Sequence, residues 1–468
     1  MVDFARVPTK MGYFTPERFE AEVFDCEVLG QVPKDMNGTF FRVGGDWLYP
    51  PLFADDAPLN SDGYISAFRF RNGVVDYRGR YVRTQRFEAD RAANRQLYGY
   101  YRNPYTDDPS VHDIDRSAAN THQYWHGGKL FVLKEDSRPW TVDPHTLETL
   151  GPWDFHGKYT ATTMSAHPKI DPVTGEMIAY GYEAKGILST DIAVYTVNPK
   201  GKITKEVWLK SPYLGIIHDI AITQKHVLIP VIARTTSLER LKSGEPMWEW
   251  NGSLPTMVGV LPRDGEAKDV RWYKGPSRNT LHFLNATDRG SKITMELPTS
   301  SGERDASQIR RWTFDLGSKD DAFQEEVVST TSGFLPRMDD RFLSLDYRYA
   351  YLSSRDSSGD AKGPPRMNVL QRLDVHTGEI SQCAAEPAHG LQEAMFVPRK
   401  NAKGEGDGYV MAIASNYESM TSDLLIADAQ KMDHGVIATV KLPFRLRSGT
   451  HTNWYPQSVL PPIKDALT

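Results

Sequence analysis

Short strand-like runs separated by turn signals recur from about residue 38 to the end of the chain, and long apolar stripes of helical period are scarce. The clearest example is DGYISAFRFRNGVVDYRGRYVRT (62–84). Its two alternating runs flank Asn72-Gly73, a dipeptide typical of two-residue hairpin turns. Similar strand–turn–strand units occur at 130–151, 177–209 and 368–382. This recurrence predicts an all-β protein.

Several hairpin units in one long chain are typical of a β-propeller, whose four-stranded sheets surround an axis. A row of β-sandwiches is the alternative, but no Pro/Gly/Ser-rich linker divides the sequence. We therefore expect one propeller domain over residues 1–468, with residues 1–30 as an N-terminal extension packed on or near it. Segments 234–253 and 353–366 interrupt the pattern, and we expect loops or short helices there, as plain surface or as a lid.

Charge and composition narrow the class of partner. The formal net charge is −5 with an isoelectric point near 6.2, and no run of five or six like charges occurs, which disfavours a nucleic-acid groove. No secretory leader and no stretch of about 18 apolar residues is visible. Two cysteines are too few for a disulfide scaffold. We expect a soluble, cytoplasmic protein without a membrane span, and a small neutral or anionic organic partner is left open.

Four of the thirteen histidines stand beside apolar or strand-like runs: His167, His218, His282 and His451. Imidazole is a common ligand for iron, zinc and copper. The four are separated by 51, 64 and 169 residues, so a shared site needs a fold that brings distant strands together. A propeller axis does this, because each blade presents its innermost strand to the centre. Spacing permits a four-histidine metal site; an ordinary hydrogen-bonded histidine is the alternative for each.

The sequences around these histidines resemble the carotenoid cleavage dioxygenase (carotenoid oxygenase) family: AHPKIDPVTGE (166–176), HDIAIT (218–223), LHFLNA (281–286) and LPFRLRSGTHTNW (442–454). NGTFFRVGG (37–45), NTHQYWHGGKLFVLKEDSRP (120–139) and QEAMFVPR (392–399) extend the resemblance, which runs from about residue 30 to the end. It implies a seven-bladed β-propeller with loops and short helices capping the metal face. It also implies one Fe(II) per chain, held by His167, His218, His282 and His451.

The resemblance implies roles for further residues. Glu135 and Glu393 match family glutamates that orient the ligating imidazoles. Phe334 stands where a third such glutamate is expected, in GFLPRMDD. Thr121 matches a threonine close to the iron, and we expect substrate contacts from Thr121 and Phe283.

Lys134, immediately before Glu135, resembles the bacterial lignostilbene dioxygenases, and Tyr101 matches a tyrosine at the phenolic end of their substrate. A 4-hydroxystilbene would then bind with its phenol between Lys134 and Tyr101. An ammonium beside a phenol favours the phenolate, which pushes electron density onto the double bond. Adjacent residues on a regular strand face opposite sides, so Lys134 and Glu135 can serve one site only at a strand end or bend. Another tyrosine of this stretch could replace Tyr101: Tyr98, Tyr100 or Tyr105.

The leading hypothesis is a non-haem Fe(II) dioxygenase that uses O₂ to cleave the central C=C bond of lignin-derived 4-hydroxystilbenoids (lignostilbenes). The products would be two aromatic aldehydes of the vanillin type. The alternatives are a carotenoid, apocarotenoid or isoeugenol-type phenylpropene oxygenase of the same family, and a metal-free propeller used as a binding scaffold. A homodimer is left open.

Overall fold

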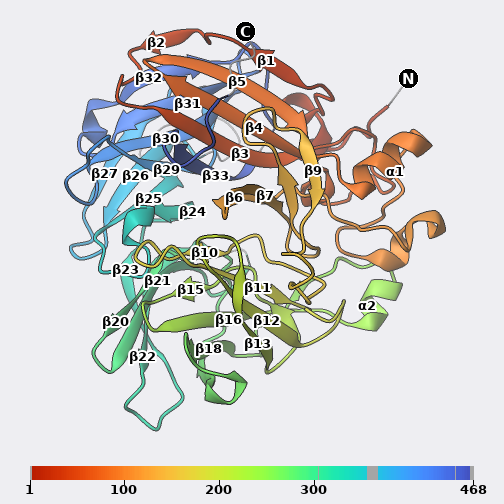
Figure 1. Ribbon diagram of the computed structural model, residues 1–468, viewed down its shortest axis with the longest axis vertical. Helices are drawn as coiled ribbons and strands as arrows, with labels where there is room; N and C mark the ends of the chain where they lie inside the picture. The colour runs from red at the N-terminus through yellow and green to blue at the C-terminus, as the bar shows by residue number, and fades with distance from the viewer. Residues whose placement is uncertain (1–2, 304, 356–366, 448, 464–468) are drawn as a thin grey trace.

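Seven β-sheets form one ring in this computed structural model, which describes residues 3–303, 305–355, 367–447 and 449–463. In Figure 1 the colour advances around the ring in sequence order, so successive blades are neighbours. The architecture is a seven-bladed β-propeller, as the sequence predicts. No helix in the described part of the chain is long and apolar enough to cross a bilayer.

The sheets follow one another in chain order. The strands of each sheet are named from the innermost to the outermost, except that β15 and β17 pair only with β16, and β29 only with β30. The first contains β33 (Gly449–Pro456), β3 (Gly38–Asp46), β4 (Asp62–Arg71), β5 (Val74–Tyr81) and β1 (Ala21–Val23). The second contains β6 (His122–His126), β7 (Lys129–Leu133), β8 (Trp140–Val142) and β9 (Thr149–Pro152). The third contains β10 (Lys169–Ile170), β11 (Met177–Tyr182), β12 (Asp191–Val197) and β13 (Ile203–Lys210). The fourth contains β14 (Gly215–Ile216), β15 (Ala221–Ile222), β16 (His226–Thr235), β17 (Glu249–Trp250), β18 (Thr256–Pro262) and β19 (Arg271–Gly275).

The remaining three sheets complete the ring. The fifth contains β20 (Asn285–Arg289), β21 (Lys292–Thr299), β22 (Gln308–Asp315) and β23 (Gln324–Ser329). The sixth contains β24 (Gly333–Met338), β25 (Tyr349–Ser354), β26 (Val369–Asp374) and β27 (Ile380–Ala384). The seventh contains β28 (His389–Leu391), β29 (Met395–Pro398), β30 (Gly408–Asn416), β31 (Thr421–Asp428), β32 (Val436–Lys441) and β2 (Val28–Gly30).

Both ends of the chain close the ring. The last strand, β33, pairs with β3 and is the innermost strand of the first sheet. The N-terminal strands β1 and β2 pair with β5 and β32 at the outer edges of the first and seventh sheets. Residues 1–30 were expected to pack on or near the propeller, and within them β2 contributes a strand to the seventh sheet. The two ends thus tie the first and last blades together.

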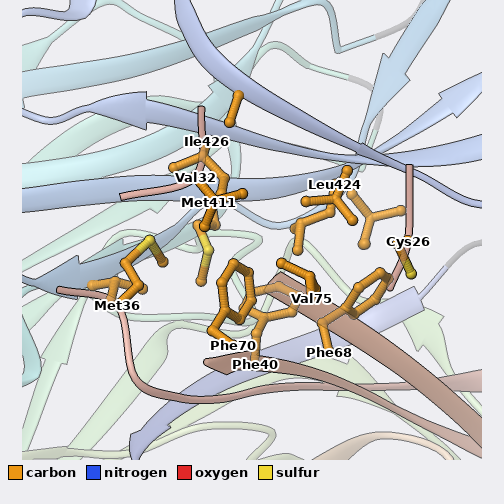
Figure 2. Close-up of a cluster of buried hydrophobic side chains, with 14 of the residues drawn as sticks. Cys26, Val32, Met36, Phe40, Phe68, Phe70, Val75, Met411, Leu424 and Ile426 are labelled. Carbon is orange, nitrogen blue, oxygen red and sulfur yellow. The ribbon is translucent and has the colours of Figure 1, made fainter. Parts of the chain in front are cut away.

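The core lies between neighbouring sheets, because each sheet buries both of its faces. Consecutive residues of β3 face opposite ways: Phe40 packs toward the seventh sheet and Phe41 toward the second. Figure 2 shows Phe40, Phe68 and Phe70 of the first sheet against Met411, Leu424 and Ile426 of the seventh. Such two-sided burial explains why the inner strands read as nearly continuous apolar runs.

The predicted hairpin at 62–84 is confirmed. Strands β4 and β5 pair antiparallel, and Asn72 and Gly73 both have positive φ, 53° and 86°, as a type I′ turn requires. The units at 130–151, 177–209 and 368–382 are also antiparallel strands.

Helices are few and short. The α-helices are α1 (Gln85–Ala93) and α2 (Leu238–Lys242). The 3-10 helices are η1 (Pro8–Lys10), η2 (Gly12–Phe14), η3 (Pro58–Asn60), η4 (Pro104–Thr106), η5 (Pro109–Val111), η6 (Ala267–Asp269), η7 (Asp340–Phe342) and η8 (Met432–His434). Segment 234–253 contains α2 and the short strand β17, whereas 356–366 of the second expected insertion lie outside the described residues.

Candidate metal centre

The four candidate histidines lie at or near the first residues of strands that face the propeller axis. His167 stands two residues before β10, His218 and His282 each stand three residues before β15 and β20, and His451 is the third residue of β33. These strands start around one axis, so the four side chains meet there although they are far apart in sequence. The convergence is the one that a propeller was expected to provide.

The four imidazoles face a common point. The Nε2 atoms of His167 and His218 are 3.1 Å apart, and those of His218 and His282 are 3.3 Å apart. One nitrogen from each ring, including that of His451, lies within 4.8 Å of the others. An all-imidazole donor set suits iron, zinc or copper better than magnesium or calcium. The residues therefore fit the iron that the family resemblance implies.

The protonation state of the rings suits a ligand role. Burial and the neighbouring imidazoles hold the pKa values of His167 and His282 well below the ordinary value. Burial also lowers the pKa of His451, against the opposing effect of Glu393. Neutral imidazole keeps the lone pair that a metal requires.

Glu135 holds His218. Its Oε2 lies 2.7 Å from Nδ1 of His218, while its Oε1 accepts hydrogen bonds from the Tyr101 hydroxyl at 3.1 Å and from Arg102 at 2.8 Å. Burial alone would raise the pKa of Glu135, but His218 and Arg102 hold it well below the ordinary value. A second buried acid, Glu183, accepts from Arg102 at 2.5 Å. The carboxylate is therefore charged and fixed on both oxygens.

Glu393 holds His451 in a different setting. Its Oε1 lies 2.9 Å from Nδ1 of His451, and its Oε2 accepts from the backbone N–H and the hydroxyl of Thr452 at 2.5 and 2.7 Å. Arg337 lies 3.5 Å away and donates to Thr452 O at 2.8 Å. Despite burial, Arg337 and His451 lower the pKa of Glu393.

Backbone contacts fix the segments that carry His167 and His282. The amide of His167 donates to Ser165 Oγ at 3.3 Å. The amide of Phe283, next to His282, donates to Asp219 at 3.1 Å, and Asp219 pairs with Lys169 at 2.7 Å. The backbone of Phe334 lies in β24, but its side chain lies outside the described part of the chain, so its relation to the site stays a prediction.

Lys134 and Tyr101 lie next to each other beside Glu135. Strand β7 ends at Leu133, so Lys134 and Glu135 follow a strand end, as the sequence required for both to serve one site. The Lys134 ammonium lies 4.3 Å from the Tyr101 ring centroid and 3.4 Å from Asp136. Burial lowers the pKa of Lys134 to about 8, against the opposing effect of Asp136. Burial, followed by Glu135, raises the pKa of Tyr101 well above the ordinary value.

The neighbouring tyrosines are placed differently. Tyr98 packs under Arg86, Tyr100 donates to Asp55 at 3.1 Å, and Tyr105 is exposed. Among the tyrosines of this stretch, Tyr101 is the one in contact with the Lys134 ammonium.

A cavity of about 320 Å³ extends along the axis from the histidines. His167, His282 and His451 border it, with Phe283 and residues further along the central strands, such as Tyr124 of β6. Lys134 lies beside the first residues of β6, whereas Tyr124 lies further along that strand. The backbone amide of Thr121, just before β6, donates to Leu133 O at 3.0 Å, and Lys134 follows Leu133. Phe283 borders this axial cavity and Lys134 does not, and the substrate contact of Phe283, like that of Thr121, stays a prediction.

Three residues near the centre were missed by the sequence reasoning. His122 stacks on His451 with ring centroids 4.5 Å apart, and its Nε2 lies 3.1 Å from the side-chain nitrogen Nδ2 of Asn453. Arg102 and Arg337 pair with Glu135 and Glu393. The one signal in the sequence was adjacency: His122 follows Thr121 and Arg102 follows Tyr101.

Residues 14–456 match the family of the retinal pigment epithelial membrane protein. Isoeugenol monooxygenase of Pseudomonas putida is 39% identical over 96% of this chain and 98% of its own length. Lignostilbene-α,β-dioxygenase isozyme III of Sphingomonas paucimobilis is 37% identical over 98% and 99%. The crystal structure of Pseudomonas brassicacearum lignostilbene dioxygenase superposes with a TM-score of 0.94 at 37% identity, over 97% of this chain and 100% of that one.

Proposed function

This chain belongs to the retinal pigment epithelial membrane protein (carotenoid oxygenase) family of alkene-cleaving oxygenases, and on that premise we propose that its substrates are lignin-derived 4-hydroxystilbenoids. The products are two aromatic aldehydes, each with one oxygen atom from O₂. The observation that carries the proposal is the contact between the buried ammonium of Lys134 and Tyr101, directly beside the carboxylate that holds His218.

Members of the family are iron-dependent, and in this proposal His167, His218, His282 and His451 hold one Fe(II) per chain. When bound, the iron supplies the activation of O₂. Glu135 and Glu393 each accept the Nδ1 proton of a histidine, which leaves the Nε2 lone pairs of His218 and His451 directed at the metal position.

The chain's own residues prepare the alkene. A free phenol has a pKa of about 10, as tyrosine does, whereas the pKa of buried Lys134 is about 8. These values alone would leave the proton on the phenol by about two pKa units. In a site that excludes water, attraction between the adjacent ammonium and phenolate offsets this difference, so neutral Lys134 takes the phenolic proton and the pair is held by its charge. The phenolate donates electron density through the ring to the conjugated double bond. Tyr101 stays protonated and continues to donate to Glu135.

A phenylpropene of the isoeugenol type is the second candidate substrate. Isoeugenol monooxygenases of Pseudomonas putida and Pseudomonas nitroreducens are 39% and 38% identical to this chain. Such a compound has the same 4-hydroxyphenyl group conjugated to an alkene, so Lys134 and Tyr101 could bind it in the same way. The two candidates differ in the group on the far side of the double bond.

The test is a substrate panel on the purified, iron-loaded protein, with product identification under ¹⁸O₂. We expect about one iron per chain, loss of activity when it is removed, and faster turnover of 4-hydroxystilbenes than of isoeugenol or a carotenoid, with label in both aldehydes. Faster turnover of isoeugenol would transfer the proposal to the second candidate. Activity that survives complete removal of iron would refute the metal assignment.

A further inference from the structure

A second cavity, of about 350 Å³, lies on the side of the histidines where the central strands begin. Its walls are largely apolar and come from segments far apart in sequence: Pro8 and Phe14 near the N-terminus, Pro58 and Leu59 of the loop before β4, and Arg447 and Thr450 near the C-terminus. The volume is at the lower end of the range for small-molecule sites.

The wall of this cavity adjoins the segments that lead into the candidate metal centre. Two of its lining residues, Asn120 and Thr450, directly precede Thr121 and His451, and the Thr450 hydroxyl donates to Asn120 O at 3.0 Å. The axial cavity begins beyond these residues, on the other side of the rings. The second cavity therefore lies on the side of the rings where Asn120 and Thr450 precede Thr121 and His451.

One loop also connects this cavity to the tyrosine at the phenolic end. Asp56 accepts from the amide of Tyr101 at 3.0 Å, and Asn60 donates to Gly99 O at 2.6 Å. Pro58 and Leu59, which line the cavity, lie between these two anchors. The Tyr101 segment and the cavity wall are thus parts of one hydrogen-bonded unit.

Arg447 is an incompletely paired cation in the cavity wall. It is only 8% exposed, and its contacts to Asp46 and to Thr9 O are 3.5 and 3.4 Å long. Its Nε has no hydrogen-bond partner among the described residues. Asp46 itself accepts a shorter bond, 2.7 Å, from Tyr81. Burial lowers the pKa of Arg447 against the effect of Asp46. A buried guanidinium with unused donors is costly unless a ligand completes its bonding.

Arg445, two residues earlier, shows what a satisfied arginine of this segment looks like. It pairs with Glu17 and donates to Gly12 O at 2.9 Å and Thr15 O at 3.2 Å. These bonds hold the N-terminal segment against the propeller, and Arg445 does not line the cavity. The contrast singles out Arg447 as the cation with capacity for a ligand.

We propose that this cavity receives the second aryl ring of the substrate and that Arg447 binds a carboxylate carried by that ring. The inference rests on the stilbenoid function proposed above. Lys134 then binds the phenolic end and Arg447 the acidic end, with the double bond between them at the histidines. Arginine suits this role because its planar donors match a carboxylate.

The experiment compares 4-hydroxystilbene-4′-carboxylate with its methyl ester, in the iron-loaded wild type and in three variants: Arg447→Met, Arg447→Lys and Arg445→Met. The readout is the ratio of kcat/KM for the acid to that for the ester. We expect Arg447→Met to lower this ratio about 10- to 100-fold through KM for the acid, because a charge-assisted hydrogen bond is lost. Arg447→Lys should keep part of it, and Arg445→Met should leave it unchanged.

An unchanged ratio in Arg447→Met, or an equal fall for acid and ester, would overturn the proposal, and so would a fall of the ratio in Arg445→Met as large as that in Arg447→Met. If the wild type cleaves neither compound, the proposed function fails separately. Binding of the same acid and ester, followed by tryptophan fluorescence, then decides the inference: it stands if Arg447→Met weakens binding of the acid alone, and fails otherwise.

Discussion

Glu135 and Glu393 make the same contact with a histidine but have different surroundings. Glu393 uses its second oxygen to accept from the backbone and hydroxyl of Thr452, the residue after His451. Glu135 uses its second oxygen to accept from Tyr101 and Arg102, which belong to the loop between α1 and η4. The Glu393 region therefore joins a candidate metal ligand to Thr452 and Arg337, whereas the Glu135 region links a candidate metal ligand to the proposed phenol site.

Removal of a histidine from either region should have the largest effect. We expect His218→Ala and His451→Ala to lose most of the bound iron and all alkene cleavage, because a four-imidazole set loses a ligand in each. His376→Ala, in an exposed turn, is the matched control and should keep its iron. Metal analysis by mass spectrometry measures the outcome; full iron occupancy in either variant would exclude that histidine as a ligand.

Lys134→Met should separate chemistry from metal binding. We expect kcat/KM for 4-hydroxystilbenes to fall by about 10²- to 10⁴-fold, the usual contribution of a positioned acid–base group, while iron stays near one per chain. Lys129→Met is the control. Lys129 is the first residue of β7, the strand that Lys134 follows, and its ammonium lies 3.9 Å from the centroid of the Trp153 ring. Equal turnover by Lys134→Met and wild type would remove Lys134 from the mechanism.

Glu135→Gln and Glu393→Gln test the comparison directly. Each should weaken iron affinity by about 10- to 100-fold, as is typical when the partner of a ligating histidine is lost. Glu135→Gln should also raise KM for a 4-hydroxystilbene, because the oxygen shared by Tyr101 and Arg102 loses its negative charge and becomes a weaker acceptor. Iron titration and steady-state kinetics on fully loaded protein measure the two effects. Equal KM values in the two variants would mean that the regions are not functionally different.

The pH profile should report Lys134. Below about pH 8 Lys134 of the free enzyme is protonated. The productive complex contains an ammonium and a phenolate, which together hold one proton fewer than a charged lysine and a neutral phenol, so one proton must be released before the complex can form. Therefore kcat/KM should fall about tenfold for each pH unit below about 8. Lys134→Met should lack this acid limb, and its persistence in that variant would assign the titration to another group.

Tyr101→Phe should have the smallest effect of the set. It removes the hydrogen bond to Glu135 but keeps the aromatic ring beside Lys134, so we expect a loss of about two- to tenfold in kcat/KM. Tyr105→Phe, at an exposed position, is the control. A loss as large as that of Lys134→Met would indicate that the Tyr101 hydroxyl acts directly on the substrate.

Local signals in the sequence were sufficient for the hairpins, because Asn72-Gly73 specifies its own turn. The meeting of the four histidines followed from the family motifs and from the geometry of a propeller. The position of Lys134 and Glu135 at the end of β7 also agreed with the requirement drawn from strand alternation.

Contacts between blades could not be predicted in the same way. His122 stacks on His451, more than 300 residues away, and Arg337 of β24 reaches Glu393 beside β29. These contacts depend on how neighbouring sheets are rotated against each other, which no local pattern encodes. The cavity beside Arg447 is built from five segments far apart in the sequence and could not be predicted for the same reason.

The closing strand β33 also orders events during biosynthesis. It carries His451 and is the innermost strand of the first sheet, although it follows all the other described strands in the sequence. A nascent chain already contains three of the four histidines, yet it lacks both the fourth and the strand that completes the ring. The proposed iron can therefore be held by all four histidines only after β33 has been made and has paired with β3.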